Sequence, residues 1–220
     1  MNTKELIDLM KLRRSVRIFT GQKVSQDQLN QILEAAIWAP TGCNMQEMRF
    51  LILDKPKDIE LIGRFKTFFQ GVSHYILILC DMGLPVSVKK YVKNRHEWRL
   101  PYMDTGLAMM NMALVAKNLG LETCVFNLSE YHFSKPKPAG ILTKLIRVFK
   151  TKFNLGLTTM DNNFEYVLRH ELGISKRYKI TGAVALGYGK FVPDPTKIYH
   201  RGEIINRRPL EYYLLKKNQK

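Results

Sequence analysis

The chain has 220 residues, and its 45% hydrophobic content is enough to bury the core of one sizeable domain. With 35 lysines and arginines against 19 aspartates and glutamates, the formal net charge is +16, which attracts anions without identifying the anion. The chain lacks the long apolar run of a membrane span, and its N-terminal segment MNTKELIDLMKLRRS is charged. We therefore expect a soluble cytoplasmic protein with no signal peptide.

The first predicted elements lead to a polar loop. RRSVRIF (13–19) follows a short helix and gathers several arginines around a serine. Ser25 followed by Gln28 has the form of a capping box, and apolar residues then recur at helical spacing until Pro40 stops the run. We predict a helix from Ser25 to Trp38, followed by a loop of small and polar residues.

Strands and a helix are predicted next. The short apolar runs at 50–53 and 75–80 have the β-branched content of buried strands. Between them, DIELIGRFKTFF (58–69) predicts a helix opened by Asp58. This part of the chain thus alternates between the two kinds of element.

The segment DTGLAMMNMALVAKNLG (104–120) predicts a long helix with Asp104 as its N-cap and Gly120 just past its end. The helix is apolar around most of its circumference, so we expect it to be buried. Two further strands are predicted at 121–127 and 179–189.

An amphipathic helix is predicted at 162–173, where it ends at Gly173. The predicted strands are separated by helices of unequal length, without a regular βαβ period. This pattern favours a layered α+β domain over a doubly wound one.

Neither the cysteines nor the histidines form a metal-binding pattern. The three cysteines, Cys43, Cys80 and Cys124, are widely separated and include no Cys-x-x-Cys pair. The five histidines show no metal-ligand spacing. We expect reduced thiols, no disulfide framework and no metal site.

Three segments, read together, resemble the nitroreductase family of flavoproteins. They are RRSVRIF, the capped helix followed by WAPTGCNMQ (38–46), and INRRPLEYYLL (204–215), in that order and spacing. The helix ending in LVAKNLGLETC also resembles the central dimer helix of that family. The resemblance implies an α+β fold with a mainly antiparallel central sheet flanked by helices. It also implies a homodimer with FMN at the subunit interface.

The resemblance assigns the phosphate of FMN to early and late arginines. Arg13 would bind it together with Arg207 or Arg208, and the sequence leaves open which of the pair does so. Arg17 would lie beside the pyrimidine edge of the flavin, where a positive charge stabilises the anionic reduced ring. The residues predicted at this end of the cofactor are Arg13, Arg14, Ser15, Arg17, Arg207 and Arg208.

The resemblance assigns the loop after the first long helix to the flavin ring of the other subunit. Gly42 lets the backbone approach the flat ring, and the Asn44 amide offers a donor and an acceptor to its polar edge. Gln46 would support the loop. The residues predicted here are Pro40, Thr41, Gly42, Asn44 and Gln46.

This loop departs from the family pattern in two places. The family often has Pro-Trp after the glutamine, whereas this chain has Glu47 and Met48, so the packing over the flavin would differ. Cys43 lies inside the loop, where contact with flavin or substrate is one interpretation and a small buried filler is the favoured one.

The chain is expected to form one domain over residues 1–220, with an inserted lid or interface segment at about 131–165. Within it, GILTKLIRVFKTKF (140–153) predicts an amphipathic helix with a basic border. Such a helix suits peripheral contact with an anionic membrane. The favoured alternative is a lid or packing helix that buries its apolar face within its own dimer.

The resemblance implies an FMN-dependent oxidoreductase that passes hydride from NAD(P)H to a small conjugated acceptor, such as a nitroaromatic, a quinone or an enone. Because that chemistry belongs to the cofactor, no catalytic nucleophile is expected in the protein. One alternative is other chemistry on the same fold, either dehalogenation or flavin fragmentation. Another is a non-catalytic basic protein that binds anionic membrane or nucleic acid, although no nucleic-acid partner is expected beside a flavin site.

Overall fold

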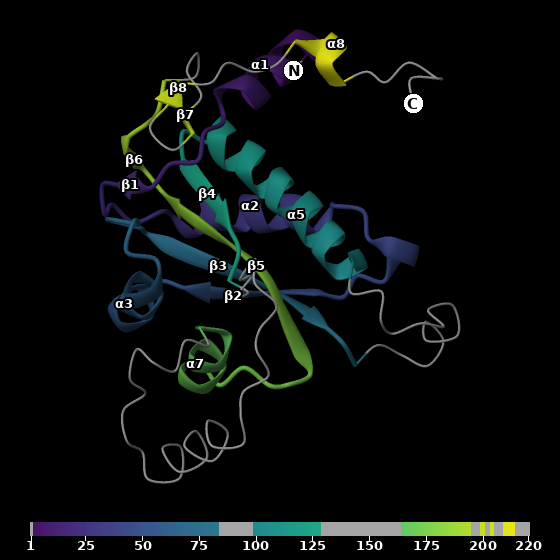
Figure 1. Ribbon diagram of the computed structural model, residues 1–220, viewed down its shortest axis with the longest axis vertical. Coiled ribbons are helices and arrows are strands. Elements are labelled where there is room, and N and C mark those ends of the chain that lie inside the picture. Colours follow the sequence, from purple (N-terminus) through teal and green to yellow (C-terminus); the bar gives the residue numbers. More distant parts are fainter. Residues whose placement is uncertain are drawn as a thin grey trace.

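A four-stranded sheet forms the centre of the computed structural model (Figure 1). The strand order is β2 (Met48–Leu53), β3 (His74–Asp81), β5 (Tyr178–Gly187) and β4 (Glu122–Phe126). Every neighbouring pair in it is antiparallel. The predicted α+β fold with a mainly antiparallel sheet is confirmed. The structure describes residues 2–83, 99–128, 164–194, 199–200, 203–204 and 209–213.

Helices cover both faces of this sheet. On one face lie α2 (Gln26–Ile37) and α5 (Arg99–Asn118), whose buried side chains share one apolar cluster (Figure 1). On the other lie α3 (Pro56–Phe65) and α7 (Phe164–Glu171), which share a second cluster. The sheet is thus the middle layer of three.

The sequence of β3 explains how the strand serves both layers. All eight of its residues are buried. Because side chains alternate along a strand, Ile76 and Ile78 contact the α2 and α5 layer. Tyr75 and Leu77 contact the α3 and α7 layer. An apolar run without polar alternation is what a strand covered on both faces requires.

Shorter elements surround the three layers. In the described part of the chain the N-terminal segment pairs with the strand that follows β5, through β1 and β6. These elements are α1 (Thr3–Leu12), β1 (Ile18–Phe19), the 3-10 helix η1 (Gly42–Asn44), β6 (Gly189–Phe191), β7 (Tyr199–His200), β8 (Glu203–Ile204) and α8 (Leu210–Tyr213).

Several predicted helix ends are confirmed. The Ser25 side chain accepts from the Gln28 backbone N–H at 3.2 Å, and the Gln28 side chain accepts from the Ser25 N–H at 3.2 Å. Gly120 and Gly173 have φ values of 75° and 64°, in the left-handed region that ends a helix. By contrast, α3 begins at Pro56 rather than Asp58, because proline is favoured in the first turn.

The structure corrects the prediction for α5 in two respects. The helix begins at Arg99, and Pro101 is tolerated because it lies in the first turn, where backbone N–H groups have no helical partner. Asp104 therefore lies inside the helix instead of capping it. In addition, the helix is not buried all round, because Met103 is 55% exposed and Met110 is also exposed.

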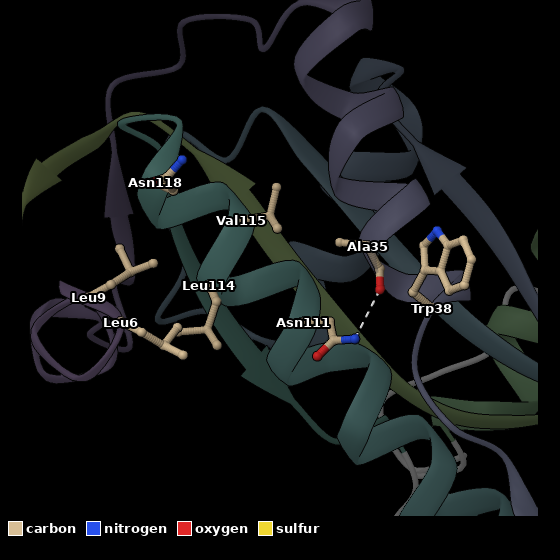
Figure 2. A pocket seen from close by; sticks show the side chains of 8 residues that line it. All are labelled: Leu6, Leu9, Ala35, Trp38, Asn111, Leu114, Val115 and Asn118. Atoms are coloured by element: carbon tan, nitrogen blue, oxygen red, sulfur yellow. Dashed lines mark hydrogen bonds between the residues drawn. The ribbon is translucent and has the colours of Figure 1, made fainter. Parts of the chain in front are cut away.

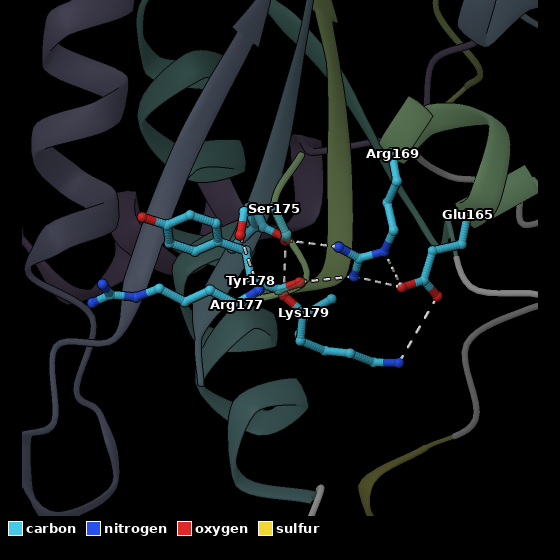
Figure 3. A network of polar contacts seen from close by, with 8 residues as sticks. Glu165, Arg169, Ser175, Arg177, Tyr178 and Lys179 are labelled. Atoms are coloured by element: carbon cyan, nitrogen blue, oxygen red, sulfur yellow. Dashed lines mark hydrogen bonds and ion pairs between the residues drawn. The ribbon is translucent and has the colours of Figure 1, made fainter. Parts of the chain in front are cut away.

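A polar network joins α7 to the start of β5 (Figure 3). Arg169 donates to Glu165 at 2.7 Å and to the Tyr178 carbonyl at 2.7 Å. Its other terminal nitrogen donates to the Ser175 carbonyl at 3.1 Å, and Lys179 lies 3.8 Å from the second Glu165 oxygen. The half-buried guanidinium of Arg169 thus fixes the turn between α7 and β5.

The segment predicted as an insertion falls mostly outside the described residues, as does the helix predicted at 140–153. The insertion at 131–165, the single domain over 1–220 and the membrane or lid role of the helix stay predictions. No helix in the described ranges is long and apolar enough to cross a membrane.

Candidate functional site

The predicted basic segment runs along the edge of the sheet beside β4. Arg13 ends α1 with an extended conformation, and the chain then continues as a strand-like segment. The Val16 N–H donates to the Thr123 carbonyl at 3.0 Å, and Ser15 forms an isolated parallel bridge with Thr123. This pairing holds the basic segment against the start of β4.

Arg13, Ser15 and Arg17 lie in one short segment, which the bridge between Ser15 and Thr123 holds beside the buried Cys124. Arg17 Nη1 donates to the Ser15 carbonyl at 3.5 Å. Burial raises the pKa of Cys124, whereas the charges of Arg17 and Arg13 act in the opposite direction. Two guanidinium groups and a serine hydroxyl within one short segment are the donors that suit a phosphate.

Arg14 is engaged differently from its neighbours. Its Nη1 donates to the Lys11 carbonyl at 2.7 Å and to the Arg13 carbonyl at 2.8 Å, so it closes the C-terminal end of α1. Arg17 is exposed and lies over the Phe68 ring, with its central carbon 5.8 Å from the ring centroid. Arg207 and Arg208 lie outside the described residues, so their contribution stays a prediction.

The predicted loop has an unusual backbone. Cys43, Asn44 and Gln46 have φ values of 53°, 52° and 48°, in the left-handed region that disfavours residues other than glycine. Each such residue costs roughly 1 kcal/mol or more unless its surroundings hold it there. Cys43 is exposed, so the expectation of a buried filler is wrong.

Hydrogen bonds within the loop hold these conformations. The Thr41 hydroxyl accepts from the Gln46 backbone N–H at 3.1 Å. The Gln46 side-chain amide donates to Asn44 Oδ1 at 3.2 Å. Pro40 and Asn44 are exposed, so this loop presents its polar edge outward.

An aspartate that the sequence assigned elsewhere anchors the loop to α5. The Gly42 N–H donates to Asp104 Oδ2 at 3.0 Å, and Asp104 is 0% exposed. Asp104 thus accepts a hydrogen bond from the first N–H of η1, and its side chain does not cap α5. A lone acidic residue in an otherwise apolar helix could have indicated such a contact, because a buried carboxylate needs a hydrogen-bond donor.

The basic segment and the loop lie near opposite ends of α5 (Figure 1). Asp104 holds the loop near the start of the helix. Lys117, near its end, forms an ion pair with Glu122, which directly precedes Thr123 and so lies beside Ser15. A helix rises about 1.5 Å per residue, which separates these two positions by roughly 20 Å. Within one chain, the predicted site residues therefore form two separate groups, one near each end of α5.

An apolar face runs along α1, α5 and the end of α2. Exposed side chains there include Ile7, Leu107 and Trp38, the last of which is 78% exposed. A pocket of about 440 Å³ opens between the three helices (Figure 2). Asn111 of α5 lines this pocket and donates to the Ala35 carbonyl of α2 at 3.0 Å, which links the two helices.

Among the described residues, no group of three His, Cys, Asp or Glu side chains could hold a metal ion.

Residues 10–132, more than half of the chain, match the profile of the Nitroreductase family. The chain belongs to the nitroreductase family.

Known proteins resemble this nitroreductase-family chain over different lengths. A Bacillus subtilis (strain 168) protein, YdgI, whose name describes it as an NAD(P)H nitroreductase, is 35% identical over 156 residues. That match covers 56% of this chain and 75% of YdgI. The iodotyrosine deiodinase of Thermotoga neapolitana is 32% identical over 105 residues, which cover 46% of this chain and 50% of the deiodinase.

Solved structures confirm the nitroreductase fold. A Desulfovibrio desulfuricans protein described as a nitroreductase, in complex with FMN, superposes with a TM-score of 0.63 at 24% identity. The match covers 100% of this chain and 99% of that protein. The α+β architecture is therefore shared along the whole length, although identity at this level establishes the fold alone.

Proposed function

We propose that this chain is an FMN-dependent oxidoreductase that passes hydride from NAD(P)H, through bound FMN, to a small conjugated acceptor. The observation that carries the proposal is the segment of Arg13, Ser15 and Arg17, which pairing with Thr123 holds against β4. The description of YdgI as an NAD(P)H nitroreductase and the FMN in the Desulfovibrio desulfuricans complex support the same activity. The acceptor would be a nitroaromatic, a quinone or an enone.

The basic segment fits the phosphate end of FMN. Arg13 is half-buried at the end of a helix, where its guanidinium fork can donate two hydrogen bonds to phosphate oxygens. The Ser15 hydroxyl offers a further donor beside it. Arg207 or Arg208 would complete the charge, and Arg14 would support the segment from the end of α1.

The loop fits the ring end. Gly42 and Thr41 present backbone at the surface, and the Asn44 side chain extends from an exposed position that its left-handed backbone fixes. Bound FMN supplies hydride transfer, while the protein orients the ring and tunes its potential. A fixed positive charge from Arg17 at the pyrimidine edge would raise that potential.

The two ends can meet only if a second copy supplies one of them, because a single chain holds them roughly 20 Å apart along α5. We therefore propose a homodimer in which each site takes its basic segment from one subunit and its loop from the other. The exposed apolar face of α1, α2 and α5 would be the contact, since apolar patches of this kind mark interfaces.

A second candidate is reductive dehalogenation at the same flavin site. It is favoured by the 32% identity with the iodotyrosine deiodinase, 50% of which the match covers. Both activities would use the flavin site proposed here, and the acceptor would distinguish them.

The test is the visible absorption spectrum of the purified protein, followed by mass identification of any molecule released on denaturation. We expect the bands of an oxidised flavin, released FMN and bleaching on anaerobic addition of NADH or NADPH. Reoxidation by a nitroaromatic, a quinone, an enone or a halogenated phenol then ranks the acceptors. A colourless protein that takes up no added FMN contradicts the proposal.

A further inference from the structure

Two carboxyl groups are buried against each other beneath the strained loop. Asp104 is 0% exposed and Glu47 is 2% exposed. Both oxygens of Glu47 and the Oδ1 atom of Asp104 are buried without a donor from any other group in the described ranges. Asp104 is among the groups that raise the pKa of Glu47, so the two buried carboxyl groups are neighbours. Two carboxylates cannot share such a site unless one of them carries a proton.

No cation neutralises this pair from the described elements. Arg49 of β2, which acts on Glu47, has a side chain that is 53% exposed and lies 3.9 Å from Asp81. Its Nη1 donates to the Gln46 and Met48 carbonyls at 3.0 and 2.7 Å. From β3, the Cys80 thiol faces the pair, and burial together with the two acids raises its pKa.

Burial raises the pKa of Glu47 above its usual range, and Asp104 raises it further, whereas the Glu47 backbone N–H and, to a smaller extent, Arg49 act in the opposite direction. Glu47 is therefore the group that holds the proton. Asp104 keeps its other oxygen on the Gly42 N–H, at 3.0 Å.

We propose that Glu47 and Asp104 share one proton and that this carboxyl pair positions the 41–46 loop. The Glu47 carboxyl donates to Asp104 Oδ1, which fixes the Asp104 side chain so that Oδ2 can accept from Gly42. Both are positioning residues, because they act through the Gly42 backbone N–H. The strained residues Cys43, Asn44 and Gln46 then start from a fixed anchor.

The sign of the pH dependence follows from the raised pKa. Below the ordinary range of a glutamate, the protonated pair is intact and its stabilisation is fully present. As the pH rises through the raised pKa, Glu47 loses its proton, two buried negative charges face each other, and the anchor is lost. The effect on FMN rests on the proposed function, whereas the effect on the loop does not.

The experiment follows the Gly42 amide signal by NMR in FMN-free protein labelled with ¹⁵N-glycine. The chain has only 14 glycines, and Gly42→Ala identifies the signal. In the wild type we expect the Gly42 signal to titrate with a midpoint clearly above about 4.3, the ordinary value of a glutamate. Absence of that titration, or a midpoint at the ordinary value, overturns the proposal.

Two variants separate the pair from general unfolding. Glu47→Gln keeps a donor for Asp104 but cannot titrate, so the Gly42 signal should stay constant over the same pH range. Asp104→Asn can accept from Gly42 and donate to an ionised Glu47, so the titration should move to lower pH. Glu60→Gln, on an exposed side chain of α3, should behave as the wild type.

If Glu47→Gln titrates like the wild type, the pair does not control the loop and the proposal is wrong. If Glu47→Gln does not fold, ¹³C-carboxyl labelling of glutamate in the wild type gives the Glu47 titration directly. A midpoint in the ordinary range then overturns the proposal. Because FMN is absent throughout, the result is independent of whether the flavin proposal holds.

Discussion

The two helical layers that cover the sheet differ in how much apolar surface they leave exposed. In the α3 and α7 layer, Leu61, Ile62 and Leu168 are buried within the chain. The α2 and α5 layer buries an equally apolar cluster against the sheet but exposes Trp38 and Met103 on its outer side. Among the described residues, the second layer leaves its apolar side chains more exposed, with Trp38 at 78% and Met103 at 55%, against 39% for Phe65 of the first layer. We call the first the closed layer and the second the open layer.

This difference matters because the two parts of the candidate site lie at opposite ends of the open layer. A tryptophan with most of its surface exposed is typical of an interface anchor. If a second copy covers the open layer, α5 from each subunit can bring its loop to the basic segment of the other. A homodimer would then account both for the exposed apolar side chains of the open layer and for the division of the site into two parts.

The largest effect should come from placing charge on the open layer. Leu107→Glu together with Met103→Glu would bury two unpaired carboxylates at the contact, and each costs several kcal/mol. We expect a monomer that retains no FMN, measured by light scattering and by the ratio of flavin to protein absorption. Gly63→Glu adds charge to the closed layer, where a side chain at that position meets open space, and should stay dimeric.

A smaller effect is expected at the basic segment. Arg13→Ala removes charge-assisted hydrogen bonds worth about 1.5–3 kcal/mol, so the Kd for FMN should rise roughly 10- to 100-fold. Quenching of FMN fluorescence measures it. Arg13→Lys should recover part of the loss, and Lys4→Ala, an exposed residue of α1, should have no effect. Unchanged affinity in Arg13→Ala would remove Arg13 from the site.

At the loop we expect turnover to change more than FMN retention. Asn44→Ala removes the amide from the ring and also places alanine at a φ of 52°. Asn44→Gly removes the same amide but suits that backbone conformation, so it separates the two causes. Steady-state kinetics with NADH or NADPH should show a lower kcat in both variants. Normal kcat in Asn44→Gly would mean that the backbone alone matters.

The smallest effect should come from the closed layer. Arg169→Ala breaks the half-buried contacts with Glu165 and the Tyr178 carbonyl, so we expect a loss of about 1–2 kcal/mol in the free energy of unfolding. Urea denaturation measures this loss. The dimer and the FMN affinity should not change, and a variant that lost FMN would show that the two layers are coupled.

The sequence was sufficient where a signal is local. The capping box at Ser25 and the apolar run of β3 depend on residues a few positions apart, and both predictions are confirmed. Asp104 was misassigned because its partner, Gly42, lies 62 positions away. The helical periodicity of α5 alone predicted burial on all sides, because an apolar helix surface looks the same in the sequence whether or not its own chain covers it.

The start of α3 shows a third kind of difficulty. Pro56 and Asp58 both favour the beginning of a helix. Both can lie in the first turn of one helix, so the two residues alone do not determine where α3 begins. The choice depends on how the chain leaves β2, which no local pattern records. For the candidate site, the residue types were predictable, whereas the contacts that anchor them were not.

The division of the site between two subunits can be tested directly with a mixed dimer. Arg13→Ala and Asn44→Ala chains carrying different tags are co-expressed, and dimers with both tags are purified and assayed at limiting FMN. If each site combines one basic segment with the partner's loop, one site of the mixed dimer is intact, giving about half of wild-type turnover. If each site lies within one chain, both sites remain defective and turnover equals the mean of the two parent variants, which would contradict the shared site.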